Sequence, residues 1–129
     1  MDVKKAIDER RSYRSFEFFN VDENLIKDLA YSASLAPSCF NNQPWRFVFV
    51  YDKNMLSKMH EALSKGNEWV RNSSLMIAVF TSKEYDCVVK NREYALFDTG
   101  LACGILMLRA TELGLVAHAI AGFDEDKVK

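Results

Sequence analysis

Three guanidinium groups and one hydroxyl lie within five residues near the N-terminus. They belong to Arg10, Arg11, Ser12 and Arg14. Arginine binds phosphate oxygens through two parallel N–H groups and keeps its charge at any physiological pH. The group therefore indicates a site for an anionic ligand. The same residues also fit a solvated surface turn, in which the preceding Asp8 and Glu9 neutralise the arginines.

A second polar group occupies residues 37–45, with the sequence Pro-Ser-Cys-Phe-Asn-Asn-Gln-Pro-Trp. Two prolines stiffen this loop, and its amide and hydroxyl groups lie beside two aromatic rings. Such groups suit a flat heteroaromatic ligand that carries carbonyls and ring nitrogens. In the alternative interpretation, the Asn and Gln side chains only satisfy the backbone of the turn.

The surrounding pattern predicts helices alternating with strands. A short helix is expected over residues 3–10, and Asp22 is expected to cap a second helix that ends before Pro37. Apolar runs at 45–51 and 75–81 predict two buried strands, separated by a helix over residues 54–63. A long helix over 93–113 should form the centre of the core. Gly114 should end it before a third strand at 115–121, and Asp124 should cap a last helix.

Length and charge exclude several classes of protein. A chain of 129 residues is long enough for one domain, and a net charge of −1 argues against a general nucleic-acid binder. The longest uncharged apolar run is residues 99–108, which begins with the polar Thr99. Its length is about half of the ~20 residues that span a bilayer. We therefore expect neither nucleic acid nor a membrane as a partner.

Three cysteines, Cys39, Cys87 and Cys103, have no spacing typical of a metal site. Together with the absence of a secretory leader, this predicts buried thiols in a reducing cytoplasm and no bound metal. His60 and His118 are isolated from other metal-binding residues, so structural roles are expected for both. Trp45 and Trp69 are expected to pack in the core or in an interface. Gly100 and Gly104 either allow another helix to approach or form a tolerated small face.

The two polar groups together resemble a known family. Arg-Arg-Ser-x-Arg followed by Pro-Ser-x-x-Asn-x-Gln-Pro-Trp-x-Phe is similar to the pattern of the nitroreductase family of FMN-dependent oxidoreductases. The resemblance continues through Lys65-Gly66-Asn67, Phe97-Asp98-Thr99-Gly100 and Ile120-Ala121-Gly122-Phe123-Asp124. It implies an α/β (α+β) fold, a three-layer sandwich with a central, mainly antiparallel sheet flanked by helices, and an intertwined homodimer. Residues 1–129 would form a single FMN-binding domain that lacks the family's C-terminal strands and arm.

The resemblance also implies roles for individual residues. Arg10 would bind the FMN phosphate, Ser12 would hydrogen bond to the phosphate or the ribityl chain, and Arg14 would lie at the pyrimidine edge of the flavin. Arg11 would belong to the same cofactor-binding group, without a specific contact. Asn67 would bind the N3 and O4 edge. The segment Ala121 and Gly122 would lie against the flavin with an amide N–H toward N5. A loop that reaches the flavin of the opposite subunit would supply Pro37, Ser38, Cys39 and Asn41.

The implied activity is electron transfer from NADH or NADPH to small aromatic acceptors, such as nitroaromatics or quinones, by a ping-pong mechanism. Chemistry would occur at FMN N5, so no side chain is expected to act as nucleophile. A cation at Arg14 would stabilise the reduced flavin. Alternatives are a non-catalytic flavin-binding or interaction protein and a specialised relative, such as a reductive dehalogenase, a flavin-modifying enzyme or an azoline-type dehydrogenase. Ala121 offers no carboxylate to orient a substrate.

Overall fold

The computed structural model describes residues 1–129 and contains helices and strands in alternation. The α-helices are α1 (Val3–Glu9), α2 (Glu23–Ser34), α3 (Lys53–Glu61), α4 (Ala95–Glu112) and α5 (Glu125–Val128). Three 3-10 helices lie between them: η1 (Cys39–Asn41), η2 (Glu68–Asn72) and η3 (Lys83–Tyr85). The strands are β1 (Arg46–Val50), β2 (Met76–Phe80), β3 (Val88–Val89) and β4 (Arg92–Glu93).

The helix boundaries follow their capping residues. The Asp22 carboxylate accepts a 2.8 Å hydrogen bond from the N–H of Leu25, and Asp124 accepts one of 3.0 Å from the N–H of Asp126. Both carboxylates satisfy amide groups that the first helical turn leaves free, which confirms the predicted N-caps. Gly114 has φ +82°, the left-handed conformation expected just after a helix.

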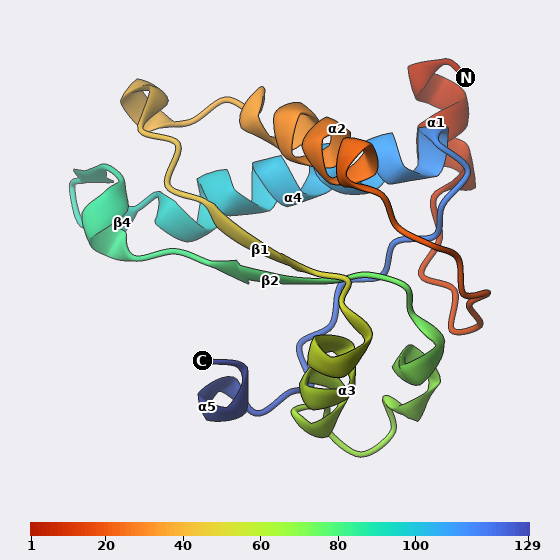
Figure 1. The fold of residues 1–129 in the computed structure, drawn as a ribbon. Helices are drawn as coiled ribbons and strands as arrows, with labels where there is room; N and C mark the ends of the chain where they lie inside the picture. The colour runs from red at the N-terminus through yellow and green to blue at the C-terminus, as the bar shows by residue number, and fades with distance from the viewer.

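Strands β1 and β2 form an antiparallel pair that runs from Arg46 opposite Phe80 to Val50 opposite Met76. Helices α1, α2 and α4 lie on one side of this pair, and α3 and α5 lie on the other side (Figure 1). This arrangement of helix, antiparallel sheet and helix agrees with the predicted α+β sandwich. Strands β3 and β4 form a separate small hairpin.

The hydrophobic core lies between α2, α4 and the sheet. Leu29 and Ala33 of α2 pack against Ala102 and Leu106 of α4, and Trp45, which is 8% exposed, completes this cluster. The expectations that the long helix contributes to the centre of the core and that Trp45 is structural are both confirmed. Helix α4 is shorter than predicted, because it begins at Ala95 and ends at Glu112.

The two main strands are less buried than predicted. Val48, Val79 and Phe80 are 48%, 43% and 51% exposed, respectively. Val48 and Phe80 lie on the face toward α3, and because α3 begins three residues after the end of β1, the helices on that side cover only one end of the sheet (Figure 1). Val79 pairs with Phe47 and therefore lies on the opposite face, where the core helices leave it exposed. The expectation of two fully buried strands is wrong for these reasons.

The predicted strand at residues 115–121 is also wrong. These residues follow α4 as irregular backbone, and the nearest ladder contact is a single antiparallel bridge between Leu63 and Phe123. An apolar run becomes a strand only where a neighbouring strand pairs with it. Within this chain β1 and β2 pair with each other alone. None of the helices combines the length and apolar character required to cross a bilayer.

Candidate functional site

The arginine group lies on an arm, residues 10–19, that leaves the end of α1. This arm runs beside the segment after α4, where the ring nitrogen Nδ1 of His118 lies 3.1 Å from the carbonyl oxygen of Tyr13. The His118 ring stacks on Trp69, with ring centres 4.5 Å apart, and Trp69 makes an edge contact of 5.3 Å with Phe16. These aromatic contacts fix the arm, and they give His118 and Trp69 the structural roles predicted for them.

The arginines of the arm have no carboxylate partner. Asp8 pairs with Lys4 at 3.0 Å and Glu9 pairs with Lys5 at 3.7 Å, each across one turn of α1. The only side-chain partner of Arg10 is the Ser12 hydroxyl at 3.4 Å, and Arg14 forms no hydrogen bond or ion pair. Asp8 and Glu9 are therefore not the ion-pair partners that the alternative of a solvated turn supplied, although Arg11, Ser12 and Arg14 are solvent-exposed, and the positive charge is available to a ligand.

Asn67 and Gly122 contact each other directly. The Asn67 amide nitrogen Nδ2 donates a 2.9 Å hydrogen bond to the Gly122 carbonyl, which also accepts one of 2.9 Å from the N–H of Ser64. A Cβ atom at position 122 would lie 2.8 Å from Asn67 Nδ2. A side chain at position 122 would therefore displace the Asn67 amide from its present place, while the neighbouring Ala121 is exposed.

These contacts connect three of the predicted site segments in one chain. The arm reaches η2 through the stacked rings of His118 and Trp69, and Asn67, just before η2, holds Gly122. The arm, Asn67 and Gly122 are thus connected through these contacts, while the side chains of Arg11, Ser12 and Arg14 stay exposed.

The fourth segment, the loop at residues 37–44, lies at the other end of α4. The N–H of Cys39 donates a 2.9 Å hydrogen bond to Asp98 in the first turn of α4, whereas Arg11 lines a hollow with Thr111 in its last turn. Asp98 and Thr111 are separated by about 20 Å along the helix axis. Figure 1 shows the loop and α1 at opposite ends of α4. One chain therefore does not bring Pro37, Ser38, Cys39 and Asn41 to the arginines.

The backbone of this loop has an unusual conformation. Phe40, Asn41 and Gln43 have φ angles of +50°, +55° and +50°. The left-handed region costs roughly 1–2 kcal/mol for a residue with a side chain, although asparagine tolerates it best. A 2.9 Å hydrogen bond from the N–H of Gln43 to the Ser38 hydroxyl helps to hold the loop in this form.

Two of the three cysteines form a disulfide, which corrects the prediction of three free thiols. Cys39 in η1 pairs with Cys87 just before β3, and their Cα atoms lie 6.0 Å apart. Only Cys103 is free, and burial raises the pKa of its thiol. The two bonded sulfurs and a carboxylate oxygen of Asp86 lie within 4.8 Å of one another. Because both sulfurs are used in the disulfide, they do not offer the thiolates that a metal ion requires.

A pair of carboxyl groups, Asp86 and Asp98, lies beside this disulfide. Asp98 is only 3% exposed, and burial together with the neighbouring Asp86 raises its pKa. Burial acts to raise the pKa of Asp86 as well. Hydrogen bonds from Asp98, from the Cys87 N–H and from Asn42 outweigh it, so that the pKa of Asp86 is lowered. The pair therefore tends to share one proton. Sequence reasoning missed this pair, although an aspartate within the apolar α4 was a visible signal.

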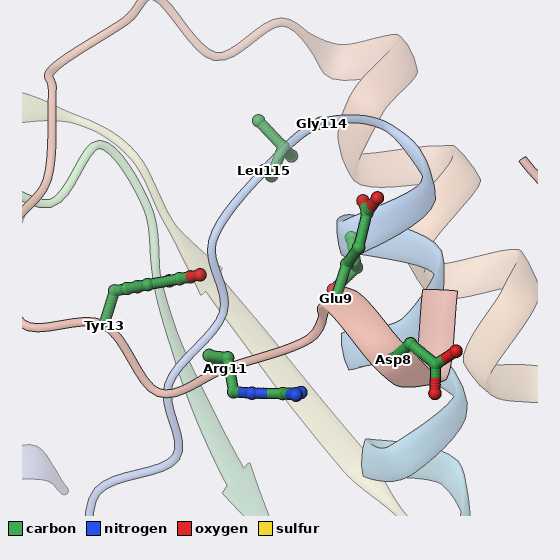
Figure 2. Close-up of a pocket in the computed structure, with 7 residues that line it drawn as sticks. Asp8, Glu9, Arg11, Tyr13, Gly114 and Leu115 are labelled. Atoms are coloured by element: carbon green, nitrogen blue, oxygen red, sulfur yellow. The ribbon is translucent and has the colours of Figure 1, made fainter. Parts of the chain in front are cut away.

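A hollow of about 440 Å³ lies between α1, the arm and the end of α4. Figure 2 shows Arg11 and Tyr13 on the arm, with Gly114 and Leu115 on the segment after α4. The carboxylates of Asp8 and Glu9 also line this hollow. Two negative groups beside one guanidinium make it a poor phosphate site, so the candidate anion site is the remainder of the arm, with Arg10, Ser12 and Arg14.

Comparison with known proteins gives a family for this arrangement. The family model described as the nitroreductase family matches residues 7–77, which is more than half of the chain. The chain belongs to the nitroreductase family. The match contains the arginine group, the 37–44 loop and Asn67, the segments that carry the resemblance in the sequence.

Two curated proteins that are similar to this chain carry different names. A protein of Archaeoglobus fulgidus with the provisional name NADH dehydrogenase/NAD(P)H nitroreductase is 34% identical over 116 residues, covering 86% of this chain and 66% of that protein. An iodotyrosine deiodinase of Haliscomenobacter hydrossis is 29% identical over 140 residues, covering 86% of this chain and 63% of that protein. The chain therefore spans just under two thirds of the length of these curated relatives.

Solved structures of nitroreductase family members share the fold. The crystal structure of a family protein from Clostridium novyi matches with a TM-score of 0.90 and 28% identity, covering all of this chain and 74% of that one. A structure described as an oxidoreductase containing FMN matches with a TM-score of 0.85 and 28% identity, covering 99% of this chain and 67% of that one. The predicted nitroreductase-like fold is thus confirmed.

Proposed function

We propose that residues 1–129 form an FMN-binding domain of an NAD(P)H-dependent oxidoreductase, which acts as a cytoplasmic homodimer on small aromatic acceptors such as nitroaromatics or quinones. The observation that carries this proposal is the group of unneutralised arginines on the arm, joined by packing to Asn67 and Gly122. The FMN content of a solved relative and the NAD(P)H in the name of a curated one support it.

The exposed polar groups fit a phosphorylated, flat ligand. Arg10 and Ser12 would bind the phosphate, because a guanidinium and a hydroxyl both donate to phosphate oxygens. Asn67 would hold the ring edge, and the missing side chain of Gly122 would let the backbone approach the ring. The positive charge of Arg14 would stabilise the reduced ring, because that form carries more negative charge near the guanidinium. FMN, when bound, supplies the two-electron redox chemistry.

The position of the 37–44 loop explains why we propose a second copy in the site. Ser38, Cys39 and Asn41 lie too far from the arm of their own chain to contact the same ligand, so each would contact the flavin held by the partner's arm. Helix α4 offers a surface for this association, since Leu96, Phe97 and Leu101 are 79%, 64% and 37% exposed. Gly100 and Gly104 lie on the same face, with nothing within 4 Å of an added Cβ.

The experiment that tests this function starts with the visible spectrum of the purified chain and the mass of any cofactor released from it. We expect flavin absorbance, identification of FMN, and bleaching by anaerobic NADH or NADPH that a nitroaromatic or quinone reverses. A protein that keeps its yellow colour under anaerobic NAD(P)H would contradict the proposed reductase activity. A colourless dimer that leaves the fluorescence of added FMN unchanged would contradict flavin binding.

A reductive dehalogenase is the second candidate, because one curated relative is named an iodotyrosine deiodinase. The same bound FMN would serve both reactions, so only the acceptor distinguishes them. Release of iodide from iodotyrosine by the dithionite-reduced protein, with no reduction of nitroaromatics, would favour this candidate.

A further inference from the structure

The disulfide between Cys39 and Cys87 connects two segments of the chain that are 48 residues apart. Cys39 lies in the 37–44 loop, and Cys87 lies between η3 and β3. The loop also hydrogen bonds to α4 through the Cys39 N–H and to the strand region through the Pro44 carbonyl, which accepts from Thr81. The disulfide is therefore the only covalent tie between this loop and the segment before β3, and it adds to the hydrogen bonds that hold the loop.

The surroundings of this disulfide are polar. Asn42 Nδ2 lies 3.4 Å from Cys87 Sγ and 3.3 Å from Asp86 Oδ1. An amide donor of this kind stabilises a sulfur that carries negative charge, because the charged form accepts the hydrogen bond more strongly. Cys87 Sγ is thus placed as a leaving group when the disulfide opens.

A source of protons lies next to the sulfurs. A carboxylate oxygen of Asp86 lies within 4.8 Å of both of them, its buried Oδ2 has no hydrogen-bond partner, and the carboxyl of Asp98 is its neighbour. Asp98 in turn accepts the N–H of Cys39. A purely structural disulfide needs neither a thiolate-stabilising amide nor a proton-sharing acid pair, and this one has both.

We propose that Cys39 and Cys87 form a redox-active pair that a dithiol reductant opens reversibly, and that opening loosens the 37–44 loop and weakens flavin binding by the neighbouring copy. The second part rests on the function proposed above, since it places Ser38, Cys39 and Asn41 at the partner's flavin. The first part stands on this chain alone. In a cytoplasm, a disulfide of this type would be transient and regulatory rather than permanent.

The exchange takes place in two steps. A thiolate of the reductant attacks Cys39 Sγ, the bond between the protein sulfurs breaks, and the acid pair transfers a proton to Cys87 Sγ as it leaves. The second thiol of the reductant gives its proton to the acid pair and attacks the mixed disulfide, which releases Cys39 as a thiolate that takes up a proton from water. In total, the protein disulfide gains two electrons and two protons, and the dithiol becomes a disulfide.

The left-handed backbone at Phe40, Asn41 and Gln43 explains why opening would change the loop. These conformations persist only where their surroundings hold them. Once the tie between Cys39 and Cys87 is broken, the Phe40 side chain, which is 90% exposed, contributes little packing, and only the hydrogen bonds within the loop hold its backbone.

Trapping of thiols under native conditions tests the redox pair. The folded chain is treated with dithiothreitol, alkylated with a maleimide and mapped by mass, with Cys103→Ser as a matched variant that removes the third thiol. We expect Cys39 and Cys87 to be closed before reduction, alkylated together after it, and closed again after removal of the dithiol in air. A pair that stays closed until the protein is unfolded, or that is already alkylated without reductant, would overturn the proposal.

A second variant tests the proton source. Asp98→Asn keeps an oxygen that can accept the Cys39 N–H but cannot supply a proton. We expect dithiothreitol to reduce this variant about a hundredfold more slowly, which is the lower range for loss of a general acid. Unchanged reduction would remove Asp98 from the exchange and overturn this part of the proposal.

Flavin titration and hydrogen exchange test the effect on the loop. We expect the FMN dissociation constant to rise about tenfold on reduction and in Cys87→Ser, a residue outside the proposed flavin contacts, but not in Cys103→Ser. Equal affinity of the oxidised and reduced protein would overturn the coupling. If neither form binds FMN, the proposed function fails instead. Hydrogen exchange of the backbone amides at residues 37–44 then tests the effect on the loop separately. It must become faster on reduction, or the loop effect is contradicted.

Discussion

The side-chain amide of Asn67 donates a 2.9 Å hydrogen bond to the backbone carbonyl of Gly122, a residue 55 positions later in the chain. This bond joins the start of η2 to the segment before α5 at the edge of the proposed flavin site. The same carbonyl also accepts the N–H of Ser64, but the bond from Asn67 is the only side-chain hydrogen bond to Gly122, so a change at one of these two residues affects the other directly.

Gly122→Ala should therefore displace Asn67. The added Cβ would lie 2.8 Å from Asn67 Nδ2, and we expect a loss of about 1 kcal/mol in the free energy of unfolding, the usual value of one hydrogen bond. Urea denaturation measures this loss. In the double variant Gly122→Ala with Asn67→Ala the clash is absent. The losses of unfolding free energy measured for the two single variants should therefore sum to more than the loss measured for the double variant. Strict additivity would show that the two residues do not act through each other.

Arg10→Ala should weaken FMN binding by roughly tenfold to a hundredfold, because a hydrogen bond to a charged group contributes about 1.5–3 kcal/mol. Fluorescence titration of FMN gives the dissociation constant. Arg92→Ala is a matched control, since Arg92 is an exposed arginine in β4, away from the arm. An equal effect of both changes would mean that net charge, rather than a specific site, governs binding.

Asp28 and Arg109 should make folding sensitive to acid. Two hydrogen bonds from Arg109, of 2.7 and 2.6 Å, lower the pKa of the Asp28 carboxyl. Because the folded state holds the ionised form more strongly, this contribution to stability is present above pH 3.8 and is lost as the pH falls through the lowered pKa. Denaturation curves measured between pH 7 and strongly acidic pH should therefore show that the free energy of unfolding falls more steeply with pH in the wild type than in Asp28→Asn.

His60 should add a second pH dependence at milder acidity. Burial, assisted by the positive charge of Arg71, lowers the pKa of its ring below 6.5, and its Nε2 atom is buried without a partner. The unfolded chain binds the proton more tightly, so stability is complete above pH 6.5 and decreases as the pH falls toward the lowered value. Removal of the neighbouring charge by Arg71→Gln should make this decrease of the melting temperature shallower. A steeper decrease would contradict the assignment.

Phe97→Asp should dissociate the proposed dimer without unfolding the chain. The Phe97 side chain is 64% exposed on α4, so a charge there meets solvent in the monomer but would be buried between two copies. Sedimentation velocity should show a monomer for this variant. Tyr31→Asp, also 64% exposed but on α2, is the control and should stay dimeric. A wild-type chain that sediments as a monomer would remove the premise of this prediction.

Local signals in the sequence were sufficient for most helices and for both main strands. Asp22, Asp124 and Gly114 mark helix ends because a cap depends on only a few neighbouring residues. The failures concern long-range pairing. Residues 115–121 have the composition of a strand, but no strand in the chain pairs with them, and Val48 and Phe80 are exposed because the helices on their side of the sheet cover only one end of it.

The candidate site was predictable to a similar extent. The arginine group, Asn67 and Gly122 were found through the family pattern, whereas the pairing of Cys39 with Cys87 depends on how β3 folds back toward η1. No spacing rule gives the partner of one cysteine among three. The proton-sharing pair of Asp86 and Asp98 was missed for the same reason, since its two members meet only in the folded chain.

The separation of the arm and the 37–44 loop along α4 has a genetic consequence. If every site combines the arm of one copy with the loop of the other, two inactive variants can rescue each other. Mixed dimers of Arg14→Ala with Asn41→Ala would contain one site with both defects and one with neither. Co-expression of the two variants should therefore restore about half of the sites in each mixed dimer. Two monomers that each contained a complete site could not rescue each other in this way.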